Sequence, residues 1–380
     1  MSKKRSIFED VDTAEKVAPV TGGIDSVKRG ARRGIRIWLM ILFALVLVMI
    51  AVGGLTRLTD SGLSITEWKP LTGALLPMSE AAWMSEFDKY RAIPEYKLQN
   101  QGMSLSEFQF IYWWEWGHRQ LGRVIGLVWA LGFFGFLLIG NIPTGWTGRL
   151  LGMGALGGLQ GAVGWWMVSS GLTGTMLDVA SYRLATHLGL AFVILGFIAW
   201  FIFELKCEER QLMQCRRHRE TRLFNLSTAL LAFAFVQILL GALVAGIDAG
   251  RTYNDWPLMS GGFIPPYPFD LVPIWRNFFE NAGLVQFMHR MAGYGLLIFG
   301  IVMWRAARRS PNSGTRGAFT VVLAMMTLQM LLGIFAVLYS APWHIAIVHQ
   351  LGAVALWVLI LRARFYAGYP TPDQLRGAAK

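Results

Sequence analysis

The feature that most constrains the fold of this chain is a series of long apolar runs. A helix needs about 20 apolar residues to cross the hydrocarbon core of a membrane, and the sequence contains a set of stretches of that kind. Mean hydropathy is +0.44, and only 15% of the residues are charged. The pattern predicts an all-α integral membrane protein with eight transmembrane helices. We expect these helices at residues 36–55, 117–139, 148–168, 185–204, 225–246, 285–304, 317–338 and 344–362.

The net charge of +12 is concentrated in a few segments that alternate with the apolar runs. Lys and Arg gather in residues 1–36, in residues 205–223, in residues 305–316 and after residue 361. All of these fall on one side if the helices alternate in direction, and basic loops face the cytoplasm. We therefore expect a multi-pass protein of the bacterial inner membrane with both termini cytoplasmic. Basic charge of this kind indicates topology rather than binding to nucleic acid.

The two halves of the chain repeat each other. Residues 53–77 align with residues 241–265 without a gap, with identical Gly, Leu, Asp, Trp and Pro residues in register. The match continues with GHRQLGR around His118 against MHRMAGY around His289, LQGAVG at 159–164 against LQMLLG at 328–333, and ATHLG at 185–189 against IVHQLG at 347–352 with one insertion. Four spans repeating as four spans predict a parallel repeat.

The repeat predicts two four-helix bundles side by side, each with its own core site. We expect the following division: a cytoplasmic segment at 1–35, an N-terminal bundle at 36–204, a cytoplasmic linker at 205–224, a C-terminal bundle at 225–362 and a cytoplasmic tail at 363–380.

Four histidines lie just inside predicted spans, in two repeat-matched pairs. His118 and His187 belong to the first half, and His289 and His349 belong to the second. An ionisable residue inside a membrane span indicates a functional site, and two facing imidazoles supply both axial positions of a b-type haem. A single membrane histidine is more often a packing residue, but four matched ones are hard to explain in that way. A non-haem metal site usually needs three or four ligands, so the pairs favour haem.

One histidine pair carries an additional acid. Glu115 lies three residues before His118, on the same helix face, and its repeat counterpart is Gln286. A carboxylate near a haem edge accepts protons or stabilises a cationic intermediate, whereas an ordinary interfacial carboxylate does neither. The asymmetry suggests that one haem site performs chemistry and the other does not.

Several arginines lie where the predicted helices meet the outer side, and they are candidates for pairing with haem propionates, which Arg binds bidentately. Ordinary interfacial arginines explain each of them equally well. The candidates are Arg57, Arg119, Arg123, Arg183, Arg251 and Arg290.

Other features receive simpler interpretations. Cys207 and Cys215 are expected to be reduced thiols in a cytoplasmic loop, and His344 is expected to be a loop residue. Residues 79–91 resemble a short amphipathic surface helix. Ser104 and Glu107 form a capping-box pattern, which predicts that the second span begins well outside the membrane.

Three runs of the sequence, together with the four histidines, resemble those of a known family. The runs EWGHRQLGR at 115–123, GGLTRLTDSGLSITEWKP at 53–70 and LQGAVGWWMVSSGL at 159–172, with the four histidines, are similar to those of haem A synthases. The resemblance extends over the chain after about residue 35 and is strongest to the proteobacterial and mitochondrial branch. The Gram-positive branch carries a Cys pair in its first outer loop that this chain lacks, so thiol chemistry there does not apply.

The resemblance implies a reaction. Haem A synthases oxidise the C8 methyl group of haem O to a formyl group by two hydroxylations, which supplies haem A for cytochrome oxidase. It implies that His118 and His187 hold the substrate haem, that His289 and His349 hold the cofactor haem b, and that Glu115 is the essential glutamate. It also implies candidate partners: membrane lipid, haem O synthase, an electron acceptor of unknown identity and further copies of the chain.

Two rival functions account for parts of the pattern. A di-haem b electron-transfer protein explains four histidines equally well, but it does not need Glu115 and predicts two equivalent haems. A transporter with parallel repeats predicts ionisable residues at the bilayer midplane, whereas the histidines here are expected near the outer surface.

Overall fold

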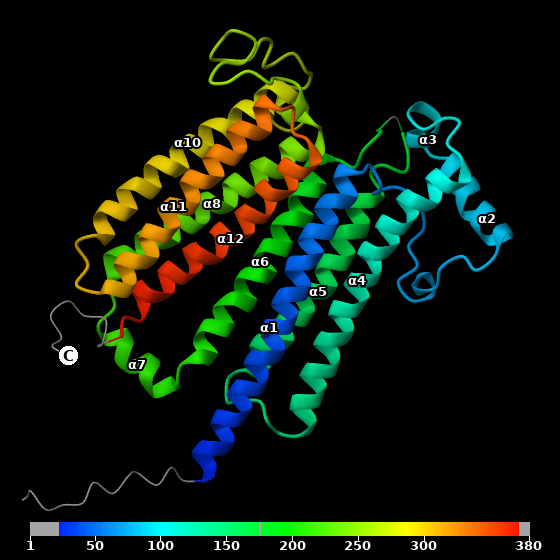
Figure 1. The fold of residues 1–380 in the computed structure, drawn as a ribbon. Helices are drawn as coiled ribbons and strands as arrows, with labels where there is room; N and C mark the ends of the chain where they lie inside the picture. Colours follow the sequence, from blue (N-terminus) through cyan, green and yellow to red (C-terminus); the bar gives the residue numbers. More distant parts are fainter. Residues whose placement is uncertain (1–22, 175, 372–380) are drawn as a thin grey trace, which may run out of the picture.

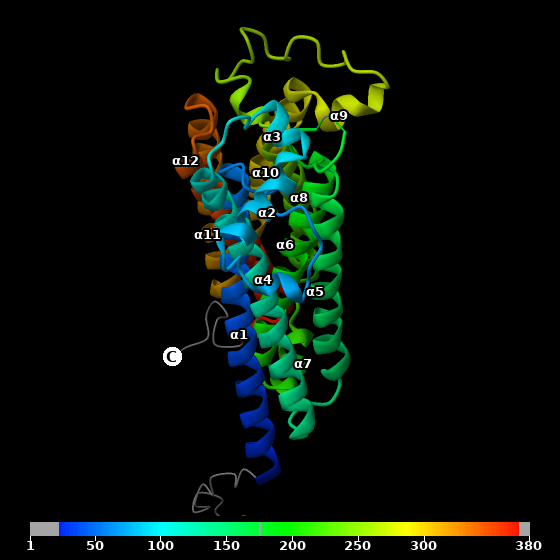
Figure 2. The same ribbon diagram turned by 90° about the vertical axis from the view of Figure 1, so that its right-hand side faces the viewer.

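The computed structural model describes residues 23–174 and 176–371, which form an elongated bundle of long helices (Figures 1 and 2). The predicted segments at 1–35 and 363–380 lie partly outside the described residues. The long helices are α1 (Gly23–Leu58), α4 (Leu105–Leu138), α5 (Thr147–Val168), α6 (Ser181–Lys206), α8 (Thr221–Gly246), α10 (Ala282–Ala307), α11 (Ser313–Leu338) and α12 (Trp343–Gly368). The shorter helices are α2 (Glu80–Arg91), α3 (Pro94–Leu98), α7 (Glu209–Arg217) and α9 (Asn277–Glu280), with 3₁₀ turns at Thr72–Ala74, Ala249–Arg251 and Ile274–Arg276.

Within the described residues, seven of the helices are long and apolar enough to cross a membrane. They correspond to seven of the eight predicted spans. The eighth, α5, forms a 22-residue helix at the predicted place but is not one of the seven. The sequence of α5 is rich in glycine, and because glycine has no apolar side chain, these residues lengthen the helix without adding apolar surface to it. The protein is therefore an all-helical, multi-pass membrane protein over the part of the chain that the structure describes.

The long helices pack in two groups. Helices α1, α4, α5 and α6 contact one another in sequence order, with α1 also against α6, and α8, α10, α11 and α12 repeat the same contacts. The groups meet where α6 packs against α8 and α12, and where α1 packs against α12. Figure 1 shows α2 and α3 at the end of the bundle opposite to the start of α1. Figure 2 places α9 at that same end, which we call the loop end.

Helix α4 extends beyond the membrane-spanning length because its start is capped. The Ser104 hydroxyl accepts a hydrogen bond from the Glu107 backbone, and the Glu107 carboxylate accepts from the Ser104 N–H at 2.8 Å, so the predicted capping box is confirmed. At 34 residues the helix is about 50 Å long, against a hydrocarbon core of about 30 Å. The predicted surface helix at 79–91 is also confirmed, as α2 with Ser79 as its N-cap.

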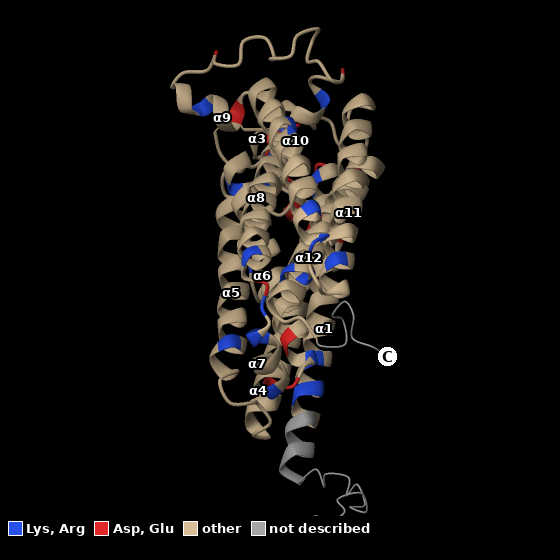
Figure 3. Ribbon diagram, turned by 90° about the vertical axis from the view of Figure 1, so that its left-hand side faces the viewer, with Lys and Arg blue, Asp and Glu red and all other residues tan. Residues whose placement is uncertain are grey.

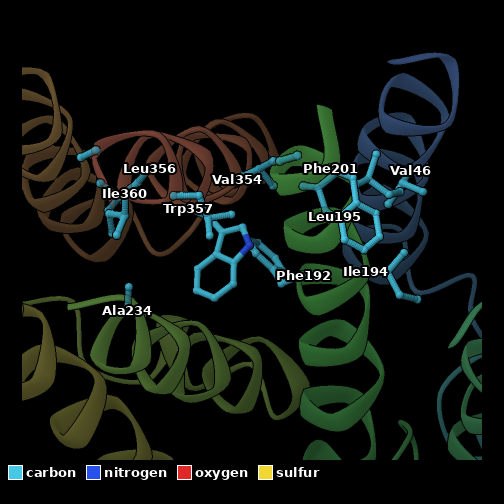
Figure 4. Packing of buried hydrophobic residues seen from close by; sticks show 14 of the residues in the cluster. Val46, Phe192, Ile194, Leu195, Phe201, Ala234, Val354, Leu356, Trp357 and Ile360 are labelled. Atoms are coloured by element: carbon cyan, nitrogen blue, oxygen red, sulfur yellow. The ribbon is translucent and has the colours of Figure 1, made fainter. Parts of the chain in front are cut away.

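The two helix groups share one apolar core. Trp357 of α12 packs edge-to-face against Phe192 of α6, with ring centroids 6.2 Å apart, and Leu195 and Ile360 are fully buried beside them (Figure 4). An ideal Cβ on Gly196 would lie 2.9 Å from the Trp357 indole nitrogen, so glycine is needed for this close approach. The core therefore holds the two groups in a fixed relative position.

Charged residues are sparse over most of the helical surface (Figure 3). The basic segments 205–223 and 305–316 connect α6 to α8 and α10 to α11, so both lie at the end where α1 begins. Cys207 and Cys215 in the first of these segments are unpaired, as expected. The expectation that His344 is a loop residue is wrong, because α12 begins at Trp343 and includes it.

Candidate functional site

All four histidines lie toward the loop end of long helices. His118 is on α4, His187 on α6, His289 on α10 and His349 on α12, and each side chain is half-buried. These four helices all run from the loop end toward the other end (Figure 1). The structure therefore brings the histidines to similar depth, as the repeat predicts.

Each histidine ring lies against a glycine of a neighbouring helix. An ideal Cβ would lie 2.8 Å from His118 Cε1 on Gly53 and 3.0 Å from His289 Cε1 on Gly241. The corresponding distance on Gly164 to His187 Cε1 is 2.9 Å, and on Gly333 to His349 Cε1 it is 3.3 Å. Real Cβ contacts shorter than 3.0 Å are essentially never seen. Gly53 matches Gly241 in the repeat, and Gly164 matches Gly333, so both halves build the same glycine notch for each imidazole.

The rings of the second pair lie at a separation at which both histidines would be able to hold one metal-bearing group. The ring centroids of His289 and His349 are 6.5 Å apart, and the ring planes are nearly perpendicular, at 87°. Two imidazoles on opposite sides of one iron need a centroid separation of about 6 Å, because each metal–nitrogen bond is about 2 Å long. Among the described residues, no three His, Cys, Asp or Glu converge on one point.

Polar atoms beside the histidines are buried without partners. The Nδ1 atoms of His118, His187 and His349 have no hydrogen bond, and neither do the amide oxygens of Gln160 and Gln237. Buried polar groups without partners are rare in folded proteins. A metal-bearing macrocycle would give the imidazoles a ligand bond, so these residues fit such a group.

Two glutamines near the rings were not found by sequence reasoning. Gln160 Nε2 donates to the His187 carbonyl at 3.0 Å, and Gln237 Nε2 donates to the His289 carbonyl at 3.0 Å and lies 3.1 Å from the ring Nδ1. Gln160 belongs to the repeated LQ pattern that Gln329 shares, whereas the position that matches Gln237 is occupied by Met49. The internal repeat therefore offers a sequence signal for Gln160 but none for Gln237.

Glu115 is buried, with 4% exposure, and its carboxylate accepts four hydrogen bonds. Oε2 accepts from the Ile65 N–H at 2.7 Å and from the Ser64 hydroxyl at 2.8 Å. Oε1 accepts from Arg119 Nη2 at 2.6 Å and from Arg119 Nε at 3.1 Å. Donors on both oxygens match the acceptor-only character of an ionised carboxylate. These four donors thus hold the Glu115 carboxylate in place one helical turn from His118 and favour its ionised form.

Gln286, the repeat counterpart of Glu115, makes the opposite hydrogen bond. It is buried, with 2% exposure, and its Nε2 donates to the Tyr253 carbonyl at 3.0 Å. Tyr253 occupies the position that matches Ile65 in the repeat. The same backbone position therefore donates to a carboxylate in one half and accepts from an amide in the other, so an ionisable acid at this place exists in the first half and a neutral amide in the second.

Arg119 and Arg290, which also match in the repeat, anchor the outer loops. Arg119 donates to the Ile65 and Glu67 carbonyls at 2.7 and 2.9 Å. Arg290 donates to the Tyr253 and Asp255 carbonyls, which occupy the matching positions, at 3.0 and 3.1 Å, and also to the Leu258 carbonyl. Each arginine therefore holds a loop over the histidine that precedes it in sequence.

The other four candidate arginines also have partners within the protein. Arg57 pairs with Asp248 at 2.6 Å and Asp60 at 3.1 Å, which joins the two helix groups at the loop end. The remaining contacts are Arg123 with the Lys69 and Pro70 carbonyls, Arg183 with the Trp166 carbonyl, and Arg251 with Asp248. Pairing of these residues with propionates stays a prediction.

Glu95 is a buried acid of α3 that the sequence reasoning missed. It is 3% exposed, and its Oε2 has no hydrogen-bond partner. Burial, together with the nearby carboxylates of Asp178, Glu115 and Asp60, raises the pKa of this carboxyl to about 8. A lone Glu in a short polar segment gives no sign of burial, because the apolar residues that cover it come from other segments.

We expect Glu95 to make stability depend on pH. The unfolded chain releases this proton near the ordinary pKa of 4.5, whereas the folded protein holds it up to about pH 8. The stability contributed by the protonated group is therefore lost as pH rises between these values. In detergent, Glu95→Gln should flatten the decline of the unfolding temperature between about pH 5 and pH 8. Replacing the exposed Glu80 with Gln should leave the decline intact, and an unchanged decline in Glu95→Gln would contradict the assignment.

Comparison with known proteins identifies the family. The sequence model of the cytochrome oxidase assembly proteins COX15-CtaA matches residues 36–361. Among the curated relatives, a protein named heme A synthase from Dinoroseobacter shibae is 65% identical over all of both chains. Proteins of the same name from Ruegeria sp. and Paracoccus denitrificans are 64% and 57% identical, with coverage of 98% and 99% of this chain and 99% and 100% of theirs. With this match over nearly the whole chain, and with the matched residues spanning all four histidines and Glu115, the protein belongs to the COX15-CtaA family of cytochrome oxidase assembly proteins.

Proposed function

We propose that this protein is a haem A synthase, an oxidoreductase that converts the C8 methyl group of haem O to the formyl group of haem A. The relatives of that name and the family match support the reaction. The observation that carries the proposal is the asymmetry between the halves. A buried carboxylate with four donors lies beside His118, and a neutral amide stands at the matching place beside His289.

In this proposal His118 and His187 hold the substrate haem O, and His289 and His349 hold a haem b cofactor. The glycine notches, the unpartnered ring nitrogens and the 6.5 Å separation of the second pair support the assignment. Haem b bound there would supply a one-electron redox centre able to accept electrons from the substrate site. The corresponding domains are the N-terminal bundle at 36–204 and the C-terminal bundle at 225–362.

Glu115 is the proposed catalytic residue. Its anionic carboxylate stabilises positive charge that develops at the substrate methyl group as electrons are withdrawn. Arg119 and the Ile65 N–H fix the orientation of the carboxylate, because each of them donates a short hydrogen bond to one of its two oxygens. The Ser64 hydroxyl, 1% exposed, is a rotatable partner that is able to exchange a proton with Oε2.

Substitution of Glu115 tests the reaction. Glu115→Gln removes the charge with little change of shape, so haem binding should persist while formyl formation falls at least about 100-fold. The measurement is chromatography of pigment extracted from the purified protein, which separates haem b, haem O, the alcohol intermediate and haem A. The matched control is Gln286→Glu in the other half, which should keep forming haem A. Wild-type protein with two haem b per chain and no haem O product would instead favour a di-haem b electron-transfer protein.

The glycine notches distinguish the two sites. Gly53→Ala places a Cβ within 2.8 Å of His118, and Gly241→Ala places one within 3.0 Å of His289, so each displaces one ligand ring. Gly53→Ala should lower the content of haem O and haem A while keeping haem b, and Gly241→Ala should lower haem b. Pigment ratios measured for both variants check this, and loss of the same haem in both would contradict the assignment.

We also propose that both termini are cytoplasmic, with the loop end outside, in the bacterial inner membrane. The basic segments 205–223 and 305–316 at the opposite end support this orientation. Green fluorescent protein fused to the C-terminus should be fluorescent, whereas alkaline phosphatase fused there should be inactive. The reverse result would place the loop end in the cytoplasm. Haem O synthase, an electron acceptor and further copies of the chain are the proposed partners.

A further inference from the structure

Two adjacent glycines of α1 face side chains of two different histidine-bearing helices, α4 and α12. Gly53 forms the notch against His118, and an ideal Cβ on Gly54 would lie 2.5 Å from Oε1 and 2.8 Å from Nε2 of Gln350. Gln350 follows His349 directly in α12. Consecutive residues of a helix point about 100° apart, so one turn of α1 contacts both histidine-bearing sites.

Gln350 also makes a hydrogen bond across the boundary between the helix groups. Its Nε2 donates to the Ile50 carbonyl of α1 at 2.8 Å. This is a side chain of the C-terminal half bonded to the backbone of the N-terminal half, between segments 300 residues apart in sequence. In a membrane span a lost hydrogen bond of this kind leaves a polar group without water to replace it. The contact therefore holds α12 against α1 in one defined position.

The symmetry-related contact lacks this bridge. Ala242 stands at the repeat position of Gly54, and it is buried in an apolar cluster with Ala185 and Leu188 of α6. The insertion that the repeat alignment requires between His349 and Leu351 coincides with Gln350. The polar bridge thus exists on one side of the duplicated structure only, as does the carboxylate of Glu115.

We propose that Gln350 is a positioning residue that fixes the His349 site relative to the His118 site across Gly53 and Gly54 of α1. This rests on the proposed function, in which electrons pass from the substrate haem to haem b. His349 is bonded along the chain to Gln350, and the Gln350 side chain donates a hydrogen bond to Ile50 of α1. One turn further along α1, Gly53 contacts the ring of His118. A shift of α12 on α1 would change the distance between the two haems while leaving each histidine pair able to bind its own.

The test uses Gln350→Met in the purified holoenzyme, since methionine keeps the length of the side chain and removes the N–H donor. We expect wild-type haem b content and an unchanged absorption spectrum. Electron transfer between the two haems after flash photoreduction should slow about tenfold, and the ratio of haem O plus alcohol to haem A should rise. Gly54→Ala, which displaces the Gln350 amide, should have the same effect. Ala242→Gly at the symmetry-related contact is the control and should behave as wild type.

Several outcomes would overturn the proposal. One is a wild-type transfer rate in Gln350→Met. Another is loss of haem b from that variant, which would make Gln350 a local support of His349. If Gly54→Ala does not fold, the methionine variant alone decides. Two haem b and no haem O in the wild type would overturn the proposed function instead, and the transfer rate between those haems would still test the bridge.

Discussion

The close packing of imidazole rings against glycine is the interaction on which the rest of the site depends. Lipid tails are as apolar as the helices, so helices associate in membranes through tight packing and interhelical hydrogen bonds. Gly53, Gly164, Gly241 and Gly333 leave the space that the four rings occupy. Because the rings fill these notches, the helices that carry the glycines approach the histidine-bearing helices closely. The loops above are then tied down by Arg119 and Arg290.

The duplicated architecture keeps its supports and varies its chemistry. The glycine notches and loop-anchoring arginines occur in both halves, with matching backbone carbonyls as their acceptors. Glu115 and Gln286 differ only in an oxygen replaced by an NH2 group, yet they reverse the direction of the hydrogen bond with the loop, and only Glu115 is able to ionise. Gln350 adds a second asymmetry at the boundary between the halves. This pattern supports the proposed division between a substrate site in the first half and a redox site in the second.

Sequence reasoning found the helices, the capping box of α4, the surface helix α2 and the four histidines, because each leaves a local or repeated signal. It missed the partners of Glu115 in residues 64 and 65, the glutamines Gln160 and Gln237, and the burial of Glu95. Ser64 reaches Glu115 across 51 positions of sequence, and no periodicity encodes such a contact. The start of α12 carries no side-chain cap, so the sequence contains no local signal that the helix begins before His344.

The sequence by itself determined the membrane class, the duplication, the pairing of histidines and the single unmatched acid, since hydropathy, alignment and residue type are all written along the chain. Only the tertiary structure decided what each of these groups contacts. It gave the arginines partners in the loops, enclosed Glu115 among four donors and brought Gln350 to α1, because those outcomes depend on how helices far apart in sequence approach one another. The helices approach one another at glycine positions, and a glycine in the sequence does not indicate which side chain of another helix will pack against it.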